Sequence, residues 1–285
     1  MQKQFKFIKQ KKSYLPQTSY LKDLLDKFWY VPSDVLQRSI EANVWEICNF
    51  RRPILDIGIG NGQLTPLIFK NILLFDVGID ITESGLDQAR KTGRYKKVLK
   101  ENAEKMNFKS AIFNSVVSNS TFEHIRNDIK AVSEVSRVLK KDGLFYFTVP
   151  CNYLPLWIYE YEKTYTASTA KLKLTKLNSR LQHLHYRSIE EWEKIFAKHG
   201  LKLEYYQYYF PKEIAVFWYR LVSFFTKKFR NKELWSYLGF SKFLKPLPKG
   251  LIKNVEKRLL FSKFKNAFFT GNKPGAMLFM VARKI

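Results

Sequence analysis

The sequence predicts an α/β protein built on a mostly parallel sheet, and three observations support this. An apolar run at Ile54–Ile57 leads directly into a glycine-rich turn over residues 58–62. Over residues 54–149, short apolar segments alternate with segments of helical periodicity, which is typical of a parallel sheet with crossover helices. A last apolar run at Ala276–Ala282 would return to the sheet as its final strand.

Five strands are expected in the alternating region. In chain order they are Ile54–Ile57, Leu73–Ile79, Val98–Leu99, Ser115–Ser118 and Leu144–Val149. A helix is expected over Asp128–Lys140, because apolar residues recur there at helical spacing. Before the first strand, Pro32-Ser33-Asp34 opens another helix, with Ser33 as its expected N-cap.

The second half of the chain departs from this alternation. Residues 151–187 are expected to form a cap near the carboxyl edge of the sheet. Glu190–His199 indicates a helix that Gly200 ends, and Leu201–Tyr209 indicates a strand. We therefore divide the chain into an N-terminal basic extension and helix (1–33), a core (34–209), a basic and aromatic helical insertion (210–274) and a last strand (275–285).

Composition limits the classes of partner and compartment. The net charge is +25, and residues 211–285 hold 17 basic and 3 acidic side chains. Such charge favours an anionic membrane, a nucleic acid or a phosphorylated substrate, although a solvated lysine-rich surface would look the same. Cys48 and Cys151 show no disulfide or metal-site spacing, which favours a reducing compartment. We expect a cytoplasmic protein, since neither a signal peptide nor a membrane-spanning segment is evident.

The glycine-rich turn indicates a nucleotide-like cofactor, because bare backbone N–H groups there can approach a ligand. A dinucleotide fingerprint needs G-x-G-x-x-G, but Gln63 directly follows the last glycine. The motif present is D-x-G-x-G-x-G, formed by Asp56, Gly58, Gly60 and Gly62. The second strand ends in Asp80, whose carboxylate can accept hydrogen bonds from both hydroxyls of a ribose.

Three further blocks follow these motifs, at Asn102–Phe108, Val117–Ile125 and Arg137–Pro150. With all of them the chain resembles the class I S-adenosylmethionine-dependent methyltransferases of the type 11-like group, which includes the ubiquinone and menaquinone biosynthesis enzymes. The resemblance covers roughly residues 35–208. Its blocks are Leu55–Gly62, Gly78–Ile81, Asn102–Phe108, Val117–Ile125 and Arg137–Pro150. It implies a three-layer Rossmann-like fold with a seven-stranded sheet, and S-adenosylmethionine as the cofactor.

The resemblance also implies roles for individual residues. Around the cofactor, Asp56, Gly58, Gly60, Asn61 and Gly62 would hold the methionine part, Asp80 and Ile81 the ribose, and Asn102, Ala103 and Glu104 the adenine. Asn119 and His124 would line the cleft where the methyl group leaves. Asn102 replaces a common Asp, and its amide oxygen can still accept a hydrogen bond.

Three histidines are candidates for the chemistry. Methyl transfer mainly needs alignment and exclusion of water, with a base only where the acceptor loses a proton. His183 and His185 would share one face if residues 183–186 are extended, and could act as a base or hold an acidic group. Alternatively, Ser188 caps the next helix and both are surface residues. His124 would transfer protons or only cap the cleft. No metal site is expected, because no further Cys or carboxylate cluster supports the His-x-His pair.

Two segments bear on the acceptor. The aromatic residues of 151–187 suit an apolar or ring-containing acceptor, or a packed lid. One helical face within 214–229 is apolar, formed by Ile214, Trp218, Leu221, Val222, Phe225 and Phe229. Basic residues accompany it, as in an interfacial helix, but a helix docked on the sheet would show the same pattern. A second basic helix is expected over Leu251–Lys263, after breaks at Pro246, Pro248 and Gly250.

Three functions stay open. The first is a methyltransferase for a small-molecule or lipid-linked acceptor, with an anionic membrane surface contacted through residues 213–230. The second is an RNA methyltransferase that binds phosphates with its basic C-terminal part. Nucleic acid is the less favoured partner, because Ser118–Thr121 lacks the Asn-Pro-Pro-aromatic motif of base methylases. The third is a non-catalytic cofactor-binding scaffold.

Overall fold

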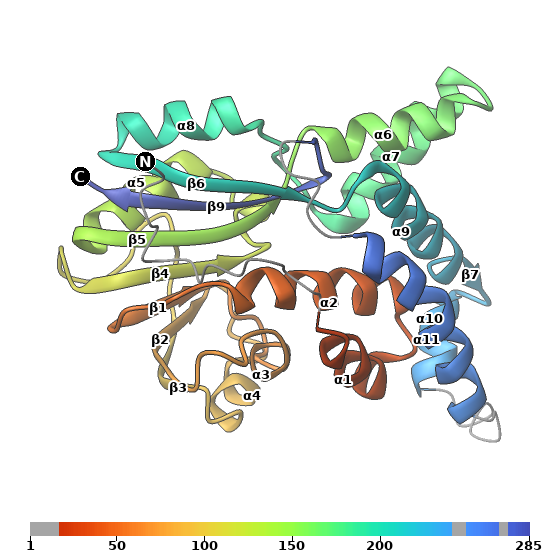
Figure 1. Cartoon of the computed structure of the whole chain (residues 1–285), viewed down its shortest axis with the longest axis horizontal. Coiled ribbons are helices and arrows are strands. Elements are labelled where there is room, and N and C mark those ends of the chain that lie inside the picture. Colours follow the sequence, from red (N-terminus) through yellow and green to blue (C-terminus); the bar gives the residue numbers. More distant parts are fainter. Residues whose placement is uncertain (1–16, 241–248, 268–272) are drawn as a thin grey trace.

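The computed structural model describes residues 17–240, 249–267 and 273–285. Its centre is a seven-stranded sheet of order β3-β2-β1-β4-β5-β9-β6 (Figure 1). The strands are β1 (Ile54–Ile57), β2 (Phe75–Asp80), β3 (Tyr95–Lys100), β4 (Phe113–Asn119), β5 (Leu139–Pro150), β6 (Leu201–Tyr209) and β9 (Met277–Lys284). β1 to β5 pair in parallel, whereas β9 is antiparallel to both β5 and β6. The predicted α/β class is therefore confirmed.

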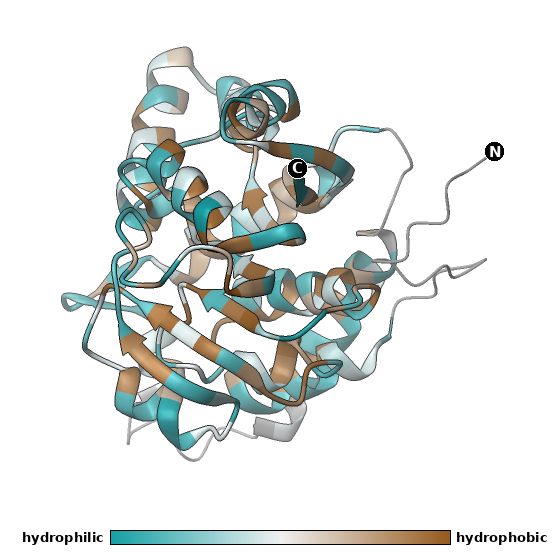
Figure 2. Cartoon of the chain, turned by 90° about the vertical axis from the view of Figure 1, so that its left-hand side faces the viewer, coloured by the Kyte–Doolittle hydropathy of each residue, from teal (hydrophilic) through white to brown (hydrophobic). Residues whose placement is uncertain are grey.

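Helices cover both faces of this sheet. α5 (Asp128–Val138) and α8 (Ile189–Lys198) share one core with the inward residues of β4 and β5. On the opposite face the core includes α2 (Pro32–Glu46), α3 (Thr65–Ile68) and α4 (Leu86–Lys91). In Figure 2 the helices are banded brown and teal, as expected of elements that bury one apolar stripe. This is the predicted three-layer arrangement.

Further helices gather beyond the carboxyl ends of the parallel strands, on the right of Figure 1. The cap contains α6 (Tyr153–Lys163) and α7 (Ala167–Leu181). The chain between β6 and β9 forms α9 (Lys212–Phe225), β7 (Lys228–Phe229), β8 (Lys232–Glu233), α10 (Leu234–Phe240) and α11 (Lys249–Asn266). α1 (Ser19–Phe28) packs against α2 and α11. The predicted helical insertion before the last strand is confirmed, while Pro246, Pro248 and the basic extension lie outside the described residues.

Some element ends differ from the predictions. Ser33 is not the N-cap of α2, because the helix already begins at Pro32; the Ser33 hydroxyl instead contacts Asp34 Oδ1 at 3.4 Å. Proline suits a first helical turn, where the N–H that it lacks would have no partner. By contrast, Ser188 does cap α8, in a reciprocal capping box with Glu191.

The predicted apolar face of α9 is mostly buried. Ile214, Trp218 and Val222 pack into the core, and α9 contacts α2 and α6. The helix ends at Phe225, so Phe229 lies in β7, where it is exposed. This face is therefore docked inside the protein, but against helices α2 and α6, whereas the docked-helix interpretation placed it on the sheet. Within the described parts of the chain, no helix is long and apolar enough to cross a membrane.

Candidate active site

The turn after β1 is shaped by three glycines with left-handed backbone conformations. Gly58, Gly60 and Gly62 have φ angles of 82°, 53° and 69°. A Cβ on Gly58 would lie 2.2 Å from Thr121 Oγ1, and one on Gly62 would lie 2.7 Å from Ala89 Cα. Around Gly60, in contrast, no atom of the described residues lies within 4 Å of such a Cβ. Gly58 and Gly62 are thus needed for packing, whereas Gly60 borders open space.

Asp80 joins this turn to the end of β2. One carboxylate oxygen accepts a hydrogen bond from the Gly60 N–H at 2.8 Å, and the other accepts from the Thr82 N–H at 2.8 Å. The next side chain, Ile81, is 62% exposed. An apolar side chain left in solvent beside a carboxylate suits a ligand with a ribose and an attached base.

The predicted adenine block also forms a compact turn. The side-chain oxygen of Asn102 accepts from the Glu104 N–H at 2.8 Å, and Glu104 Oε1 accepts from the Asn127 N–H at 3.0 Å. Ala103 is buried between them. These contacts place the block at the end of β3, beside the start of α5.

Asp56 lies in the interior at the end of β1. Its Oδ2 accepts a hydrogen bond from the Tyr95 hydroxyl at 2.7 Å, and that hydroxyl also contacts Thr65 Oγ1 at 2.7 Å. Burial raises the pKa of the Asp56 carboxyl to about 7, with the charge of Asp80 adding to the effect. Its predicted role in holding the methionine part of the cofactor stays a prediction.

Asn119 is engaged within the protein. Its side-chain oxygen accepts from Trp45 Nε1–H at 2.7 Å and from the Thr148 hydroxyl at 3.0 Å, and its Nδ2 donates to Glu41 at 3.2 Å. The neighbouring Ser120, which also donates to Glu41 at 2.9 Å, lines the adjoining cavity. The Asn119 side chain therefore supports this wall from behind.

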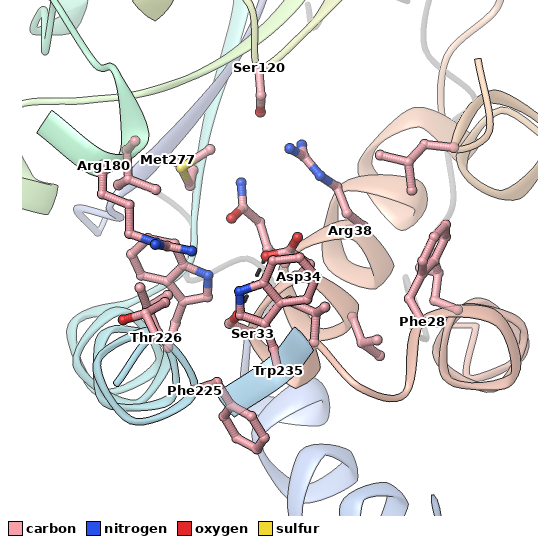
Figure 3. Close-up of a pocket in the computed structure, with 18 of the residues that line it drawn as sticks. Phe28, Ser33, Asp34, Arg38, Ser120, Arg180, Phe225, Thr226, Trp235 and Met277 are labelled. Carbon is pink, nitrogen blue, oxygen red and sulfur yellow. Dashed lines mark hydrogen bonds between the residues drawn. The ribbon is translucent and has the colours of Figure 1, made fainter. Parts of the chain in front are cut away.

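A cavity of about 560 Å³ opens beside the glycine turn. Its wall combines the turn, α1, α2, the cap and the insertion. The lining includes Phe28, Asp34, Arg38, Asn61, Gln63, Ser120, Glu123, His124, Arg180, His183, Trp218, Phe225 and Trp235. Figure 3 shows Arg38 and Arg180 entering from different elements, with Asp34 between them. The cavity is thus lined by aliphatic and aromatic side chains together with a few charged groups.

The charged groups of the cavity are paired unequally. Arg38 contacts the fully buried Glu41 at 2.5 Å, and Arg180 Nη2 donates to Glu233 Oε2 at 2.9 Å. Asp34 has no ion-pair partner within 4.0 Å among the described residues, and its side chain is exposed to the cavity that it lines. Loss of hydration within the protein raises the pKa of the Asp34 carboxyl, and the nearby charge of Arg38 opposes this effect.

Two of the three predicted histidines meet in this cavity. The rings of His124 and His183 lie 5.1 Å apart, beside the buried Glu123. Burial lowers the pKa of His183 to about 3 and raises that of Glu123 to about 8. His185 is elsewhere: its Nε2 lies 3.0 Å from the Ile125 carbonyl oxygen. His183 thus lies beside His124 and His185 beside Ile125, and of the two only His183 lines the cavity. A shared catalytic role for His183 and His185 stays a prediction.

Comparison with known proteins identifies the domain. The family profile described as "Methyltransferase domain" matches residues 55–147, the stretch that holds β1 to β5. Residues 55–147 are a class I methyltransferase domain. Its cofactor is S-adenosylmethionine, as predicted.

Two curated relatives match part of the chain. The uncharacterized methyltransferase YcgJ of Bacillus subtilis is 33% identical over 105 residues, and the uncharacterized protein MJ1252 of Methanocaldococcus jannaschii is 32% identical over 105 residues. These matches cover 34% and 37% of this chain, and 40% and 39% of the relatives. The chain thus spans about two fifths of the length of the relatives that it matches.

Solved structures share the fold over nearly the whole chain. A methyltransferase from Thermotoga maritima, described as a possible histamine N-methyltransferase, has a TM-score of 0.53 at 17% identity, covering 94% of this chain and 99% of that one. Geranyl diphosphate C-methyltransferase from Streptomyces coelicolor has a TM-score of 0.51 at 13% identity, covering 98% and 90%. At such identities the likeness establishes the fold.

The methyltransferase domain has the features that S-adenosylmethionine needs. Open space above Gly60 leaves its backbone accessible, and Asp80 stands at the end of β2 with acceptor lone pairs left for a ribose. The exposed Ile81 offers apolar contact to a base. When bound, the cofactor supplies an electrophilic methyl group on sulfur. The residue roles themselves stay predictions.

Sequence reasoning missed the contribution of α2 to the cavity. Asp34, Arg38 and Glu41 follow one another at spacings of four and three residues, which places them on one face of the helix. Such a charged stripe on an otherwise buried helix was a detectable signal. Arg180 and Trp235 carried no comparable signal, because only the tertiary fold brings α7 and α10 to the cavity.

Proposed function

We propose that the chain is an S-adenosylmethionine-dependent methyltransferase that modifies a small-molecule or lipid-linked acceptor bound in this cavity. The supporting observation is the cavity itself, which lies beside the cofactor turn and beneath the cap and insertion. Its volume of about 560 Å³ is within the usual range for small-ligand sites. A cavity of this size, lined by aliphatic and aromatic side chains with a few charged groups, suits a compact, partly apolar acceptor better than a polynucleotide.

The charged groups of the cavity support a more specific chemistry for the acceptor, a hydroxyl or amine. Because Arg38 and Arg180 are already paired, Asp34 is the cavity carboxyl best placed to accept a hydrogen bond from an acceptor hydroxyl or amine. Its position allows it to orient that group and to take its proton as the methyl group arrives. Aromatic side chains around it would exclude water from the transfer.

The first experiment tests transfer. Purified protein receives S-adenosylmethionine with a labelled methyl group and a cell lysate, which is then separated into lipid, small-molecule, protein and RNA pools. We expect label in the small-molecule or lipid pool. Label in RNA would replace this proposal with the RNA alternative, and cofactor binding without transfer to any pool would favour the scaffold.

Matched variants separate the cofactor from the acceptor. Asp80→Ala should lose cofactor binding, whereas Asp87→Ala should retain it, because the Asp87 side chain is 85% exposed on α4. Asp34→Asn should bind cofactor normally but transfer methyl about 10²-fold more slowly, the lower end of the usual contribution of a general base. Unchanged transfer by Asp34→Asn would remove Asp34 from the mechanism.

We propose further that the end of α9 contacts an anionic membrane from which a lipid-linked acceptor enters. Phe225 lines the cavity, while the neighbouring Phe224 is 52% exposed and Phe229 is 63% exposed. Lys227 lies 5.6 Å from the ring centre of Phe224, and the Arg230 guanidinium lies 5.6 Å from that of Phe229. Exposed aromatic rings with adjacent cations suit a membrane interface.

Liposome co-sedimentation tests this contact. The double variant Phe224→Ser/Phe229→Ser should lose binding to anionic vesicles, while the control Leu172→Ser, at a residue 55% exposed on α7, should bind like wild type. If the double variant and the control both bind anionic vesicles like wild type, this end of α9 is not the contact.

A further inference from the structure

Glu123, His124 and His183 converge on one wall of the cavity. Each offers one ligand atom, and these atoms all lie within 4.8 Å of one another. Glu123 and His124 belong to the short 3₁₀ helix Phe122–His124 after β4, and His183 follows α7. The Leu184 N–H donates to the Glu123 carbonyl oxygen at 2.7 Å, which fixes the two segments together.

The hydrogen bonds of both histidines leave the same ring nitrogen free. His124 Nδ1 lies 3.1 Å from the Gln182 carbonyl oxygen, which can only accept, so this Nδ1 carries the proton. The Tyr186 hydroxyl donates to Asn178 Oδ1 at 2.8 Å and must therefore accept from His183 Nδ1 at 2.9 Å. Each Nε2 is thereby left with a lone pair. Metal-binding histidines are oriented in this way, with one nitrogen held and the other coordinating.

Glu123 supplies an independent observation. Its side chain is 2% exposed, and its Oε2 has no hydrogen-bond partner among the described residues. Its Oε1 lies 3.9 Å from His124 Nε2. An unpartnered carboxyl oxygen in the interior is costly, and a bound cation beside it would remove that cost.

The surrounding charges allow a cation here. Arg38 is the basic group that faces the cluster from α2, and its charge is compensated by Glu41 at 2.5 Å. Arg180 is paired with Glu233, while Asp34 adds another carboxyl to the cavity. The acidic side chains here (Asp34, Glu41, Glu123 and Glu233) are more numerous than the basic ones (Arg38 and Arg180). A divalent ion would therefore not face uncompensated positive charge.

We infer that Glu123, His124 and His183 form a binding site for a divalent transition metal of the zinc type. Two imidazole nitrogens and one carboxylate are the protein ligands of many zinc sites that keep a further position open. That position would face the cavity, where an acceptor oxygen or nitrogen could occupy it; this last consequence rests on the proposed function. This cluster was not predicted from the sequence, because His124 and His183 lie 59 positions apart in the chain and meet only in the folded structure.

The experiment uses the untagged full chain, stripped with a chelator and then titrated with Zn²⁺ and, separately, Co²⁺. We expect one metal ion per chain by elemental analysis, and the Co²⁺ form should show the visible absorption of a low-symmetry, four- or five-coordinate site. Glu123→Gln and His183→Gln should lower the affinity at least tenfold, whereas His185→Gln, two residues away but turned elsewhere, should retain it. Tyr186→Phe should weaken binding about 10–100-fold, as expected for loss of a group that orients a ligand.

Wild-type protein that binds less than about one tenth of an equivalent of Zn²⁺ would overturn the inference, whatever the variants do. So would equal loss of metal by His185→Gln and His183→Gln. Binding of S-adenosylmethionine is measured on the same samples, with and without metal. Failure of the metal site with intact methyl transfer, or the reverse, therefore separates this inference from the proposed function.

Discussion

Two glycines of the turn, Gly58 and Gly60, allow the same substitution by alanine to be compared in a packed and in an open position. In Gly58→Ala the new Cβ would lie 2.2 Å from Thr121 Oγ1, at a backbone φ of 82°. The left-handed conformation costs a non-glycine residue about 1–2 kcal/mol, and forcing a methyl group into a packed site costs about 1–3 kcal/mol more. We therefore expect Gly58→Ala to lower the free energy of unfolding by about 2–5 kcal/mol.

In Gly60→Ala the same methyl group enters open space. Within the part of the chain that the structure describes, no atom lies within 4 Å of the new Cβ, and the φ of 53° falls within the small left-handed region that alanine can adopt. Only the conformational cost applies, so we expect a loss of about 1–2 kcal/mol. The methyl group would, however, occupy space where the cofactor approaches the backbone, so cofactor affinity should fall much more than stability.

Urea unfolding and calorimetric titration with S-adenosylmethionine measure the two effects on the same protein samples. Gly58→Ala should be the less stable variant, and Gly60→Ala the folded variant that binds poorly. The reasoning is refuted if Gly60→Ala destabilises the chain as much as Gly58→Ala does. It is refuted equally if Gly60→Ala binds the cofactor like wild type.

Two further predictions concern stability. The Asp56 pKa is about 7 in the folded chain and about 4 when unfolded, so the folded state binds more protons between these pH values. The free energy of unfolding should therefore fall by about 4 kcal/mol as pH rises from 4 to 8. Asp56→Asn, which can still accept a hydrogen bond from Tyr95, should lack this part of the pH dependence in urea unfolding. An identical slope in both proteins would contradict the assigned pKa. Ser188→Ala removes the capping box of α8 and should cost about 1 kcal/mol by thermal or urea unfolding, whereas no change would show that the cap contributes nothing.

The cofactor half of the molecule could be predicted because its determinants are local. β1 has the bounds expected from its apolar run, and Asp80 lies at the end of β2 as the motif spacing required. Strand, turn and acid occupy neighbouring positions in the chain, so their order alone places them at one edge of a parallel sheet. The difference at the start of α2 has a local cause too. Proline is favoured in the first turn of a helix, so the helix begins at Pro32 and Ser33 lies inside it instead of capping it.

The acceptor half could not be predicted in the same way, because its residues meet only through long-range packing. The cavity joins Arg38 of α2, Arg180 of α7 and Trp235 of α10, which no sequence period connects. The apolar face of α9 had two interpretations, and tertiary contacts with α2 and α6 decided between them by burying Trp218. The histidines show the same limit: the alternation pairs His183 with His185, but only the tertiary fold shows that His183 meets His124 in the cavity while His185 contacts the Ile125 carbonyl oxygen. Under the proposed function, acceptor specificity depends on how the cap, the insertion and α2 pack over the methyltransferase domain. We therefore expect substitutions at their mutual contacts to change acceptor selectivity before they change cofactor binding.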